Sequence, residues 1–373
     1  MQRQTHTLHS ATPGTTQQLI SLHYGTPGRG PKVYIQGSLH ADEVPGMLVA
    51  HHLRRHLDAA EAAGHIQGEI VLVPMANPIG THQWVLRGYQ GRFDVASGEN
   101  FNRQFTDLAP AVLTAVGGRL TGDAAHNVAT VRAALRDAVA ALPNGNPLAH
   151  LRRTLLGLAI DADVVLDLHC DGEAVLHLYT TPQTWAGRGE LLARHLGAEV
   201  ALLAEHSGGE PFDEACSMVW VDVAARLPAA NPLPAACLAA TIELRGEADV
   251  RHDLAAADAQ HIVHYLSAIG ALAGPAPEPP PARCEATPLA GSMPLIAPHG
   301  GMVVFLATPG TPVAAGTPLV DLIDPIEGLT TTLAAPVDGL FFARDLRRFA
   351  HAGMTLGKVA GREAQRSGTL LSA

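Results

Sequence analysis

The sequence predicts an α/β domain followed by a small all-β domain. Apolar runs of strand length alternate with helical patterns over the first 274 residues. This alternation is typical of a mainly parallel or mixed sheet flanked by helices. A proline-rich segment, PAPEPPP, then occupies residues 275–281, and helical periodicity disappears after it. We therefore expect a first domain over residues 1–274, a linker over 275–286 and a C-terminal β domain over 287–373.

The first predicted elements lie between residues 32 and 78. KVYIQ at 32–36 has strand composition, and Pro45 and Gly46 then open a helical pattern that ends near Gly64. Proline suits the first turn of a helix because the N–H that it lacks would have no partner there. GEIVLVPMANP at 68–78 is apolar throughout its first half, as a buried parallel strand should be.

The middle of the chain predicts a loop and then further helices and strands. Residues 81–107 have no clear period and many Gly, Asn and Arg residues, so we expect a functional loop there. The predicted helices that follow cover residues 126–142, 148–160, 187–198 and 252–274, with a PNGNP turn at 143–147 between the first two. The predicted strands cover residues 163–169, 174–180 and 237–246.

The C-terminal region contains short strands separated by Gly and Pro. Its GTPVAAGTPLV hairpin and APVDG turn resemble a biotinyl/lipoyl-like sandwich. Carriers of that type present a modified lysine at a hairpin tip, whereas Lys358, near the end, is the only lysine of this region. A lid or an oligomer contact is therefore more plausible than a carrier role.

Composition and charge exclude several classes of protein. Apolar residues make up 47% of the chain and charged residues 16%, which is typical of a compact enzyme. The formal charge is −10 and no basic patch is visible, so we expect no nucleic-acid partner. The N-terminus lacks the apolar core of a signal peptide, and no apolar run reaches membrane-spanning length. The four cysteines form no CxxC pair, and we expect a cytoplasmic protein without a membrane partner.

Three predicted strands end in residues that bind metals or transfer protons. Open α/β sheets place their sites at the carboxyl ends of strands. Two imidazoles and one carboxylate form the ligand set of a catalytic zinc that keeps one position for water, and a further carboxylate can act as the base. The residues at these strand ends are His40, Glu43, Asp167, His169, Asp171, Glu243 and Arg245.

Other histidines and the loop give weaker signals. A single histidine is more often a hydrogen-bonding residue than a ligand, so the prediction depends on the joint pattern. The histidines of the LVAHHLRRHL helix are expected to be solvated or packed against a neighbouring helix, while His177 and His206 stay candidates for orienting a ligand. In the loop, Arg92, Asn102 and Arg103 can form a carboxylate clamp; the alternative is a solvated, salt-bridged loop.

Several motifs occur together in a recognisable order. GSLHADEVPG, the NPIG turn, GENFNR, DLHCD and TIELRG resemble, in this order, the succinylglutamate desuccinylase/aspartoacylase family within the wider zinc carboxypeptidase-like group. The resemblance covers residues 32–270, and the all-β tail matches the two-domain layout of that family. It implies a zinc-carboxypeptidase-like fold in which the first domain, 1–274, is a zinc hydrolase catalytic domain.

The resemblance also implies the metal ligands. His40, Glu43 and His169 would bind one zinc ion per chain. The family's first motif more usually reads HGDE, and Ala41 here replaces the glycine, a change that affects loop freedom more than ligation. The same ligands would accept Co, Mn or Ni.

The remaining roles concern the reaction. By the resemblance, Glu243 is the general base and later passes the proton to the leaving amine. The resemblance also implies that Arg92 would polarise the scissile carbonyl and that Asn102 and Arg103 would hold the substrate carboxylate. Asp167 lies two residues before the third ligand, so it would share that strand face and could orient the imidazole.

We therefore expect a zinc-dependent amidohydrolase that deacylates an N-acyl amino acid or a similar small amide with a carboxylate. One alternative is a metallocarboxypeptidase that acts on a peptide C-terminus with the same zinc and clamp. Another is a catalytically silent small-molecule-binding homologue. The DLHCDGEA context differs from that of better-studied members, so the resemblance alone does not assign their substrates to this chain. The sequence leaves the acyl group, the amine and homo-oligomer formation open.

Overall fold

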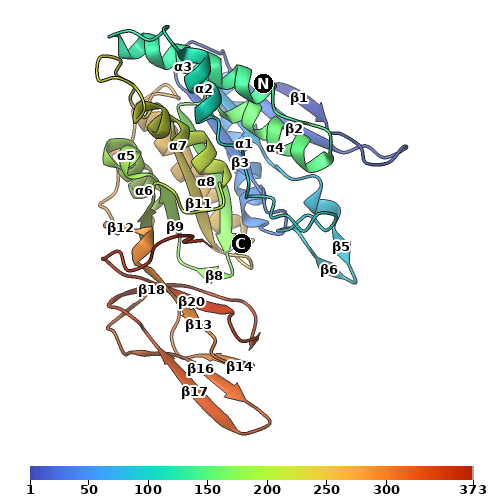
Figure 1. Ribbon diagram of the computed structural model, residues 1–373, viewed down its shortest axis with the longest axis vertical. Coiled ribbons are helices and arrows are strands. Elements are labelled where there is room, and N and C mark those ends of the chain that lie inside the picture. Colours follow the sequence, from blue (N-terminus) through green and yellow to red (C-terminus); the bar gives the residue numbers. More distant parts are fainter. Residues whose placement is uncertain (372–373) are drawn as a thin grey trace.

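The structure, a computed structural model that describes residues 1–371, has an α/β part and an all-β part (Figure 1). In the described chain, the α/β part is built on a mixed sheet of nine strands with helices on both faces. The predicted large mixed α/β fold is therefore confirmed. Among the described residues, no helix is both long and apolar enough to cross a membrane.

The strands at the centre of the large sheet run parallel, and those at both edges include antiparallel pairs. The four neighbouring strands β4, β3, β7 and β11 are parallel, whereas β1 and β2 form an antiparallel hairpin on one edge and β9 runs antiparallel to β11. The spatial order is β1 (Gln2–Thr7), β2 (Gln18–Gly25), β4 (Glu69–Val73), β3 (Lys32–Gly37), β7 (Val164–Asp171), β11 (Leu238–Gly246), β9 (His177–Thr180), β10 (Val200–Leu203) and β12 (Ala286–Pro288).

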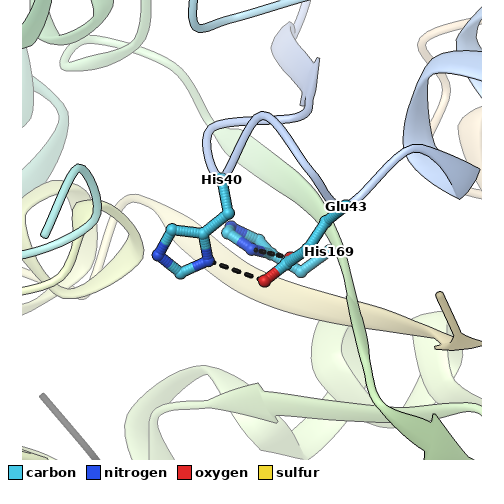
Figure 2. A group of neighbouring side chains, drawn as sticks. All are labelled: His40, Glu43 and His169. Carbon is cyan, nitrogen blue, oxygen red and sulfur yellow. Dashed lines mark hydrogen bonds and ion pairs between the residues drawn. The ribbon is translucent and has the colours of Figure 1, made fainter. Parts of the chain in front are cut away.

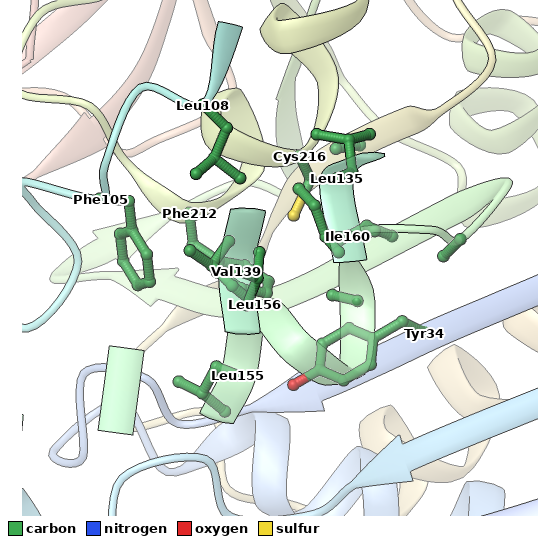
Figure 3. Packing of buried hydrophobic residues seen from close by; sticks show 14 of the residues in the cluster. Tyr34, Phe105, Leu108, Leu135, Val139, Leu155, Leu156, Ile160, Phe212 and Cys216 are labelled. Carbon is green, nitrogen blue, oxygen red and sulfur yellow. The ribbon is translucent and has the colours of Figure 1, made fainter. Parts of the chain in front are cut away.

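Two groups of helices cover the sheet. One face packs against α1 (Pro45–Ala62), α6 (Glu190–Leu196) and α8 (His252–Ala268). The opposite face packs against α2 (Ala109–Val116), α3 (Ala124–Ala140), α4 (Pro147–Ala159) and α7 (Phe212–Ala224), and a short α5 covers Pro182–Thr184. Figure 3 shows part of the core on the second face, where helix side chains meet Tyr34 of β3.

Side-chain alternation along β7 decides which residues face each layer. Leu166 and Leu168 pack in the core under α1, α6 and α8, while Val165 packs in the core on the α7 side. Because successive residues of a strand point to opposite faces, Asp167 and His169 share the α7 side with Val165. The central strand therefore has a continuous apolar face on one side and ends in polar groups on the other.

The all-β part lies below the large sheet in Figure 1 and consists of two antiparallel sheets packed around one core. One sheet contains β13 (Ser292–Ile296), β20 (Thr355–Ala360), β18 (Gly339–Arg344) and β15 (Thr311–Val313), together with β8 (Glu173–Ala174). The other contains β17 (Leu329–Ala334), β16 (Pro318–Asp324), β14 (Gly301–Phe305) and β19 (Phe349–Ala350). The strand that follows the proline-rich segment, β12, still pairs with the large sheet, so the all-β part begins after it.

The buried central strand gives a stability prediction. Leu166 is fully buried in β7, so Leu166→Ala should lower the free energy of unfolding by about 2–5 kcal/mol, through lost burial and the cavity that remains. Leu306 is 49% exposed, and Leu306→Ala should change it by less than about 0.5 kcal/mol. Urea unfolding of both variants tests this, and equal losses would contradict the assigned core.

Candidate metal centre

The loop between β3 and α1 is folded tightly against the central strand. Ser38 adopts a positive φ of 59°, and its hydroxyl donates to the Glu43 carbonyl oxygen at 3.0 Å. Gly46, in the first turn of α1, lies against β7 so closely that a Cβ there would come 2.9 Å from the Leu168 carbonyl oxygen. The helix can therefore start directly beside the strand that carries His169.

Three buried side chains converge at this point (Figure 2). His40 Nδ1 lies 2.8 Å from one carboxylate oxygen of Glu43, and His169 Nδ1 lies 2.7 Å from the other. The two rings meet edge to face with centroids 5.0 Å apart. One ligand atom from each of the three residues lies within 4.8 Å of the others, so the group could hold a metal ion.

The charges of the cluster suit a cation. Burial would raise the pKa of Glu43, but the two imidazoles outweigh it and hold this pKa well below its usual range. Burial lowers the pKa of His40, which favours the neutral imidazole that a metal needs. An ionised carboxylate and two imidazoles whose Nδ1 atoms point to one place match the protein ligands of a catalytic zinc, so the residues fit the predicted metal.

Asp167 stands behind His169. Its Oδ2 lies 3.0 Å from His169 Nε2, which is within ion-pair distance. The angle between the two groups does not meet that of a hydrogen bond. Its Oδ1 accepts a hydrogen bond from Gln36 at 2.9 Å, and Tyr34 donates in turn to Gln36 at 2.7 Å. Burial would lower the pKa of His169, but the charges of Asp167 and Glu43 raise it well above its usual range. The predicted neighbour is thus in contact with the ligand.

Asn100 orients His40 in the same way, although no role was predicted for it from the sequence. Its Oδ1 lies 2.9 Å from His40 Nε2 and also accepts a hydrogen bond from the Asn102 amide at 2.8 Å. With Nε2 engaged, His40 presents Nδ1 to Glu43. The only signal in the sequence was the position of Asn100 within the GENFNR motif.

Glu243 faces the cluster from the next strand. It is in register with His169 in the parallel pair of β11 and β7, so the two side chains share a face. Its Oε2 is buried without a hydrogen-bond partner. Burial, followed by the charge of Glu43, raises the pKa of Glu243 to about 8. An unpartnered carboxyl group of raised pKa beside a metal site is suited to accepting a proton.

The predicted functional loop lies directly over the loop that carries the first two ligands. Tyr89 donates to the Ala41 carbonyl oxygen at 2.7 Å, and the Ala41 amide donates to the Gly91 carbonyl oxygen at 2.9 Å. Next to this anchor, Arg92 Nη1 lies 3.2 Å from Glu43 Oε1. The structure therefore brings Arg92 to the edge of the ligand cluster.

Asn102 and Arg103 are buried and belong to the same loop. The Asn102 Oδ1 accepts a hydrogen bond from the Phe212 amide at 2.8 Å, which ties the loop to the start of α7. Arg103 Nη1 donates to the Asn102 carbonyl oxygen at 2.7 Å. Burial, followed by the charge of Arg92, lowers the pKa of Arg103, so the two guanidinium groups act on one another. The charges of Asp213, Glu214 and Glu43 act on Arg103 in the opposite direction.

The other predicted histidines lie outside the cluster. His177 Nδ1 lies 2.8 Å from the Val175 carbonyl oxygen, and its Nε2 lies 3.4 Å from the Tyr179 hydroxyl. His206 is exposed and pairs with Asp222 at 3.4 Å. Neither side chain touches the three ligands in these contacts.

Known proteins resemble this chain in sequence and in fold. Residues 29–114 match the sequence model described as "Succinylglutamate desuccinylase/Aspartoacylase catalytic domain". Comparison of the sequence with curated proteins gives no match.

Solved structures extend the likeness to almost the whole chain. A succinylglutamate desuccinylase/aspartoacylase family protein from Shewanella amazonensis is 29% identical with a TM-score of 0.84, covering 96% of this chain and 98% of its own. A protein described in the same way from Shewanella frigidimarina is 26% identical with a TM-score of 0.83, covering 96% of each chain.

A more distant structure shares the fold alone. The ectoine utilization protein EutE from Ruegeria pomeroyi is 15% identical with a TM-score of 0.66, covering 96% of this chain and 93% of its own. This chain thus carries the catalytic-domain signature of the succinylglutamate desuccinylase/aspartoacylase family and folds like solved proteins of that family, which confirms the resemblance predicted from its sequence.

Proposed function

We propose that the protein is a zinc-dependent amidohydrolase that removes the acyl group from an N-acyl amino acid or a similar small amide bearing a carboxylate. The observation that carries this proposal is the buried group of His40, Glu43 and His169 with the unpartnered carboxyl group of Glu243 beside it. The likeness to solved desuccinylase/aspartoacylase family proteins supports the same class of reaction.

In this proposal His40, Glu43 and His169 hold the metal. Zinc in such a site lowers the pKa of bound water to about 7 and polarises a carbonyl group. Asn100 and Asp167 keep the two imidazoles in the orientation that points Nδ1 at the site, since each contacts the far nitrogen of one ring. We propose Asp167 as the positioning residue for His169.

Glu243 then moves the protons. It accepts a proton from the attacking water and passes it to the leaving amine, which requires a carboxylate close to the metal with a free oxygen atom. Arg92 lies at the cluster edge and stabilises the negative charge that develops on the substrate oxygen. Asn102 and Arg103 hold the substrate carboxylate; because Oδ1 of Asn102 is engaged by α7, its amide NH₂ is the group left to donate.

Metal analysis tests the ligand assignment. The purified protein should contain about one zinc ion per chain, the stoichiometry of a single open catalytic site. His40→Ala and His169→Ala should lose it, because each removes a ligand. His51→Ala, at an exposed position of α1, is the control and should keep it. Wild-type protein that holds no metal and takes none up on adding zinc would contradict the proposal.

Substitution of Glu243 separates binding from catalysis. Glu243→Gln keeps the shape of the side chain but cannot accept the proton, so kcat should fall by about 10²–10⁴-fold with zinc content unchanged. Assays should compare N-acyl amino acids with dipeptides, which also distinguishes a deacylase from a carboxypeptidase. The exposed Glu190→Gln of α6 is the control. A Glu243→Gln variant that retains wild-type kcat would exclude Glu243 as the base.

Asp167→Asn tests the positioning role. The amide keeps the hydrogen bonding to Gln36 possible but removes the charge beside His169, so zinc affinity or kcat should fall by about 10–100-fold. Competition with a chromogenic chelator measures the affinity. Unchanged affinity together with unchanged kcat would mean that Asp167 serves the fold alone.

A further inference from the structure

A lysine of the all-β part reaches the edge of the candidate metal centre. Lys358 lies on β20, paired with Pro294 of β13 and Ala343 of β18. Its Nζ donates to the Asp171 Oδ2 at 2.6 Å, and its side chain is 32% exposed. The pair therefore joins the all-β part to the last residue of the central strand β7.

Asp171 is close to the residues of the proposed reaction. It lies two residues after His169, so it shares the strand face of that ligand and stands about 7 Å further along β7. On the neighbouring strand, Glu243 is in register with His169 and Gly246 with Asp171. Asp171 and Glu243 are thus two carboxylates at the same end of two paired strands, where like charges repel.

The charges of these groups act on one another. Partial burial would lower the pKa of Lys358, but the charge of Asp171, and to a smaller extent that of Glu243, raises this pKa above its usual range. In the opposite direction, the charge of Asp171 raises the pKa of Glu243 and that of Lys358 lowers it. The ammonium group therefore offsets the negative charge that Asp171 places near Glu243.

The segment after Asp171 is shaped to dock against the all-β part. Ala174 pairs with Ala343, the neighbour of Lys358 in the sheet, and Glu173 forms ion pairs with Arg344 and Arg348. A Cβ at Gly172 would lie 2.8 Å from the Arg344 carbonyl oxygen, so this approach requires glycine. The end of β7 is consequently held by the all-β part.

We propose that Lys358 is a positioning residue for the hydrolytic reaction: by pairing with Asp171, it anchors the end of the strand that carries His169 and keeps the Asp171 carboxylate from displacing Glu243. This inference rests on the proposed function. On this proposal the all-β part supports the active site through Lys358 and does not serve as a carrier.

The Arg344–Glu173 pair provides a matched control. It joins the same two parts of the chain, through β18 and β8, but its carboxylate is Glu173, which lies two residues further than Asp171 from the ligand His169. A general loss of docking should affect Lys358→Met and Arg344→Met alike. A positioning role should affect Lys358→Met alone.

Kinetics of four variants test the proposal on the zinc-loaded full-length protein. Lys358→Met should lower kcat about tenfold, the order expected for an unbalanced charge within several ångströms, with KM within about threefold because the clamp lies on another loop. Lys358→Arg, which keeps the charge, should restore kcat to within about threefold. The double variant Asp171→Asn/Lys358→Met, which removes both charges, should recover part of the loss. Arg344→Met should keep kcat within about twofold.

Zinc content and melting temperature are measured for each variant. One zinc per chain in all of them, with similar melting temperatures for Lys358→Met and Arg344→Met, assigns the loss of kcat to positioning. Equal losses of kcat in these two variants, or unchanged kcat in Lys358→Met, would overturn the role proposed for Lys358 and would leave the proposed function untouched. A zinc-loaded wild type that hydrolyses no amide would instead overturn the proposed function, and this inference with it.

Discussion

The parallel pairing of β7 with β11 is the constraint on which the candidate site depends. It sets His169 beside Glu243, and Asp167, two residues before His169, lies on the same face of the strand. A slip of either strand by one residue would turn its polar side chain into the apolar core under α1, α6 and α8. Burying an unpaired charge there costs several kcal/mol, so the register is strongly specified. The fold thus enforces the geometry that the chemistry needs.

The loop at residues 81–107 adds the parts that the sheet cannot supply. The Tyr89 hydroxyl and the Gly91 carbonyl oxygen anchor it to the backbone of Ala41, while the side chains of Arg92 and Asn100 contact Glu43 and His40. The side-chain oxygen of Asn100 contacts His40, and that of Asn102 accepts a hydrogen bond from the first residue of α7. Irregular backbone next to a metal site is therefore held by hydrogen bonds that cross between distant segments.

The strand ends could be predicted from the sequence because each is a local pattern: an apolar run followed by ligand-type residues. His40, Glu43 and His169 come together as expected since the carboxyl ends of parallel strands meet at one edge. The contact of Asn100 with His40 joins residues 60 positions apart, and that of Lys358 with Asp171 spans 187. Such contacts depend on tertiary packing, so the hydrophobic periodicity of the sequence does not indicate them. The antiparallel hairpin of β1 and β2 was missed for a different reason: every residue of β1 is exposed or half-buried, so this edge strand has no apolar run to signal it.

The balance of charge at the strand ends connects the metal with the all-β part. Four carboxylates, those of Glu43, Asp167, Asp171 and Glu243, lie on or beside the ends of β7 and β11. Such a group is costly to bury unless cations accompany it. Arg92 contacts Glu43, Lys358 contacts Asp171 and His169 lies beside Asp167, whereas Glu243, whose pKa is raised to about 8, loses its proton more easily when a metal cation is nearby. A divalent ion at the three ligands would therefore stabilise the folded site as well as activate water. Because Lys358 of the all-β part already neutralises Asp171, that ion has less negative charge to balance.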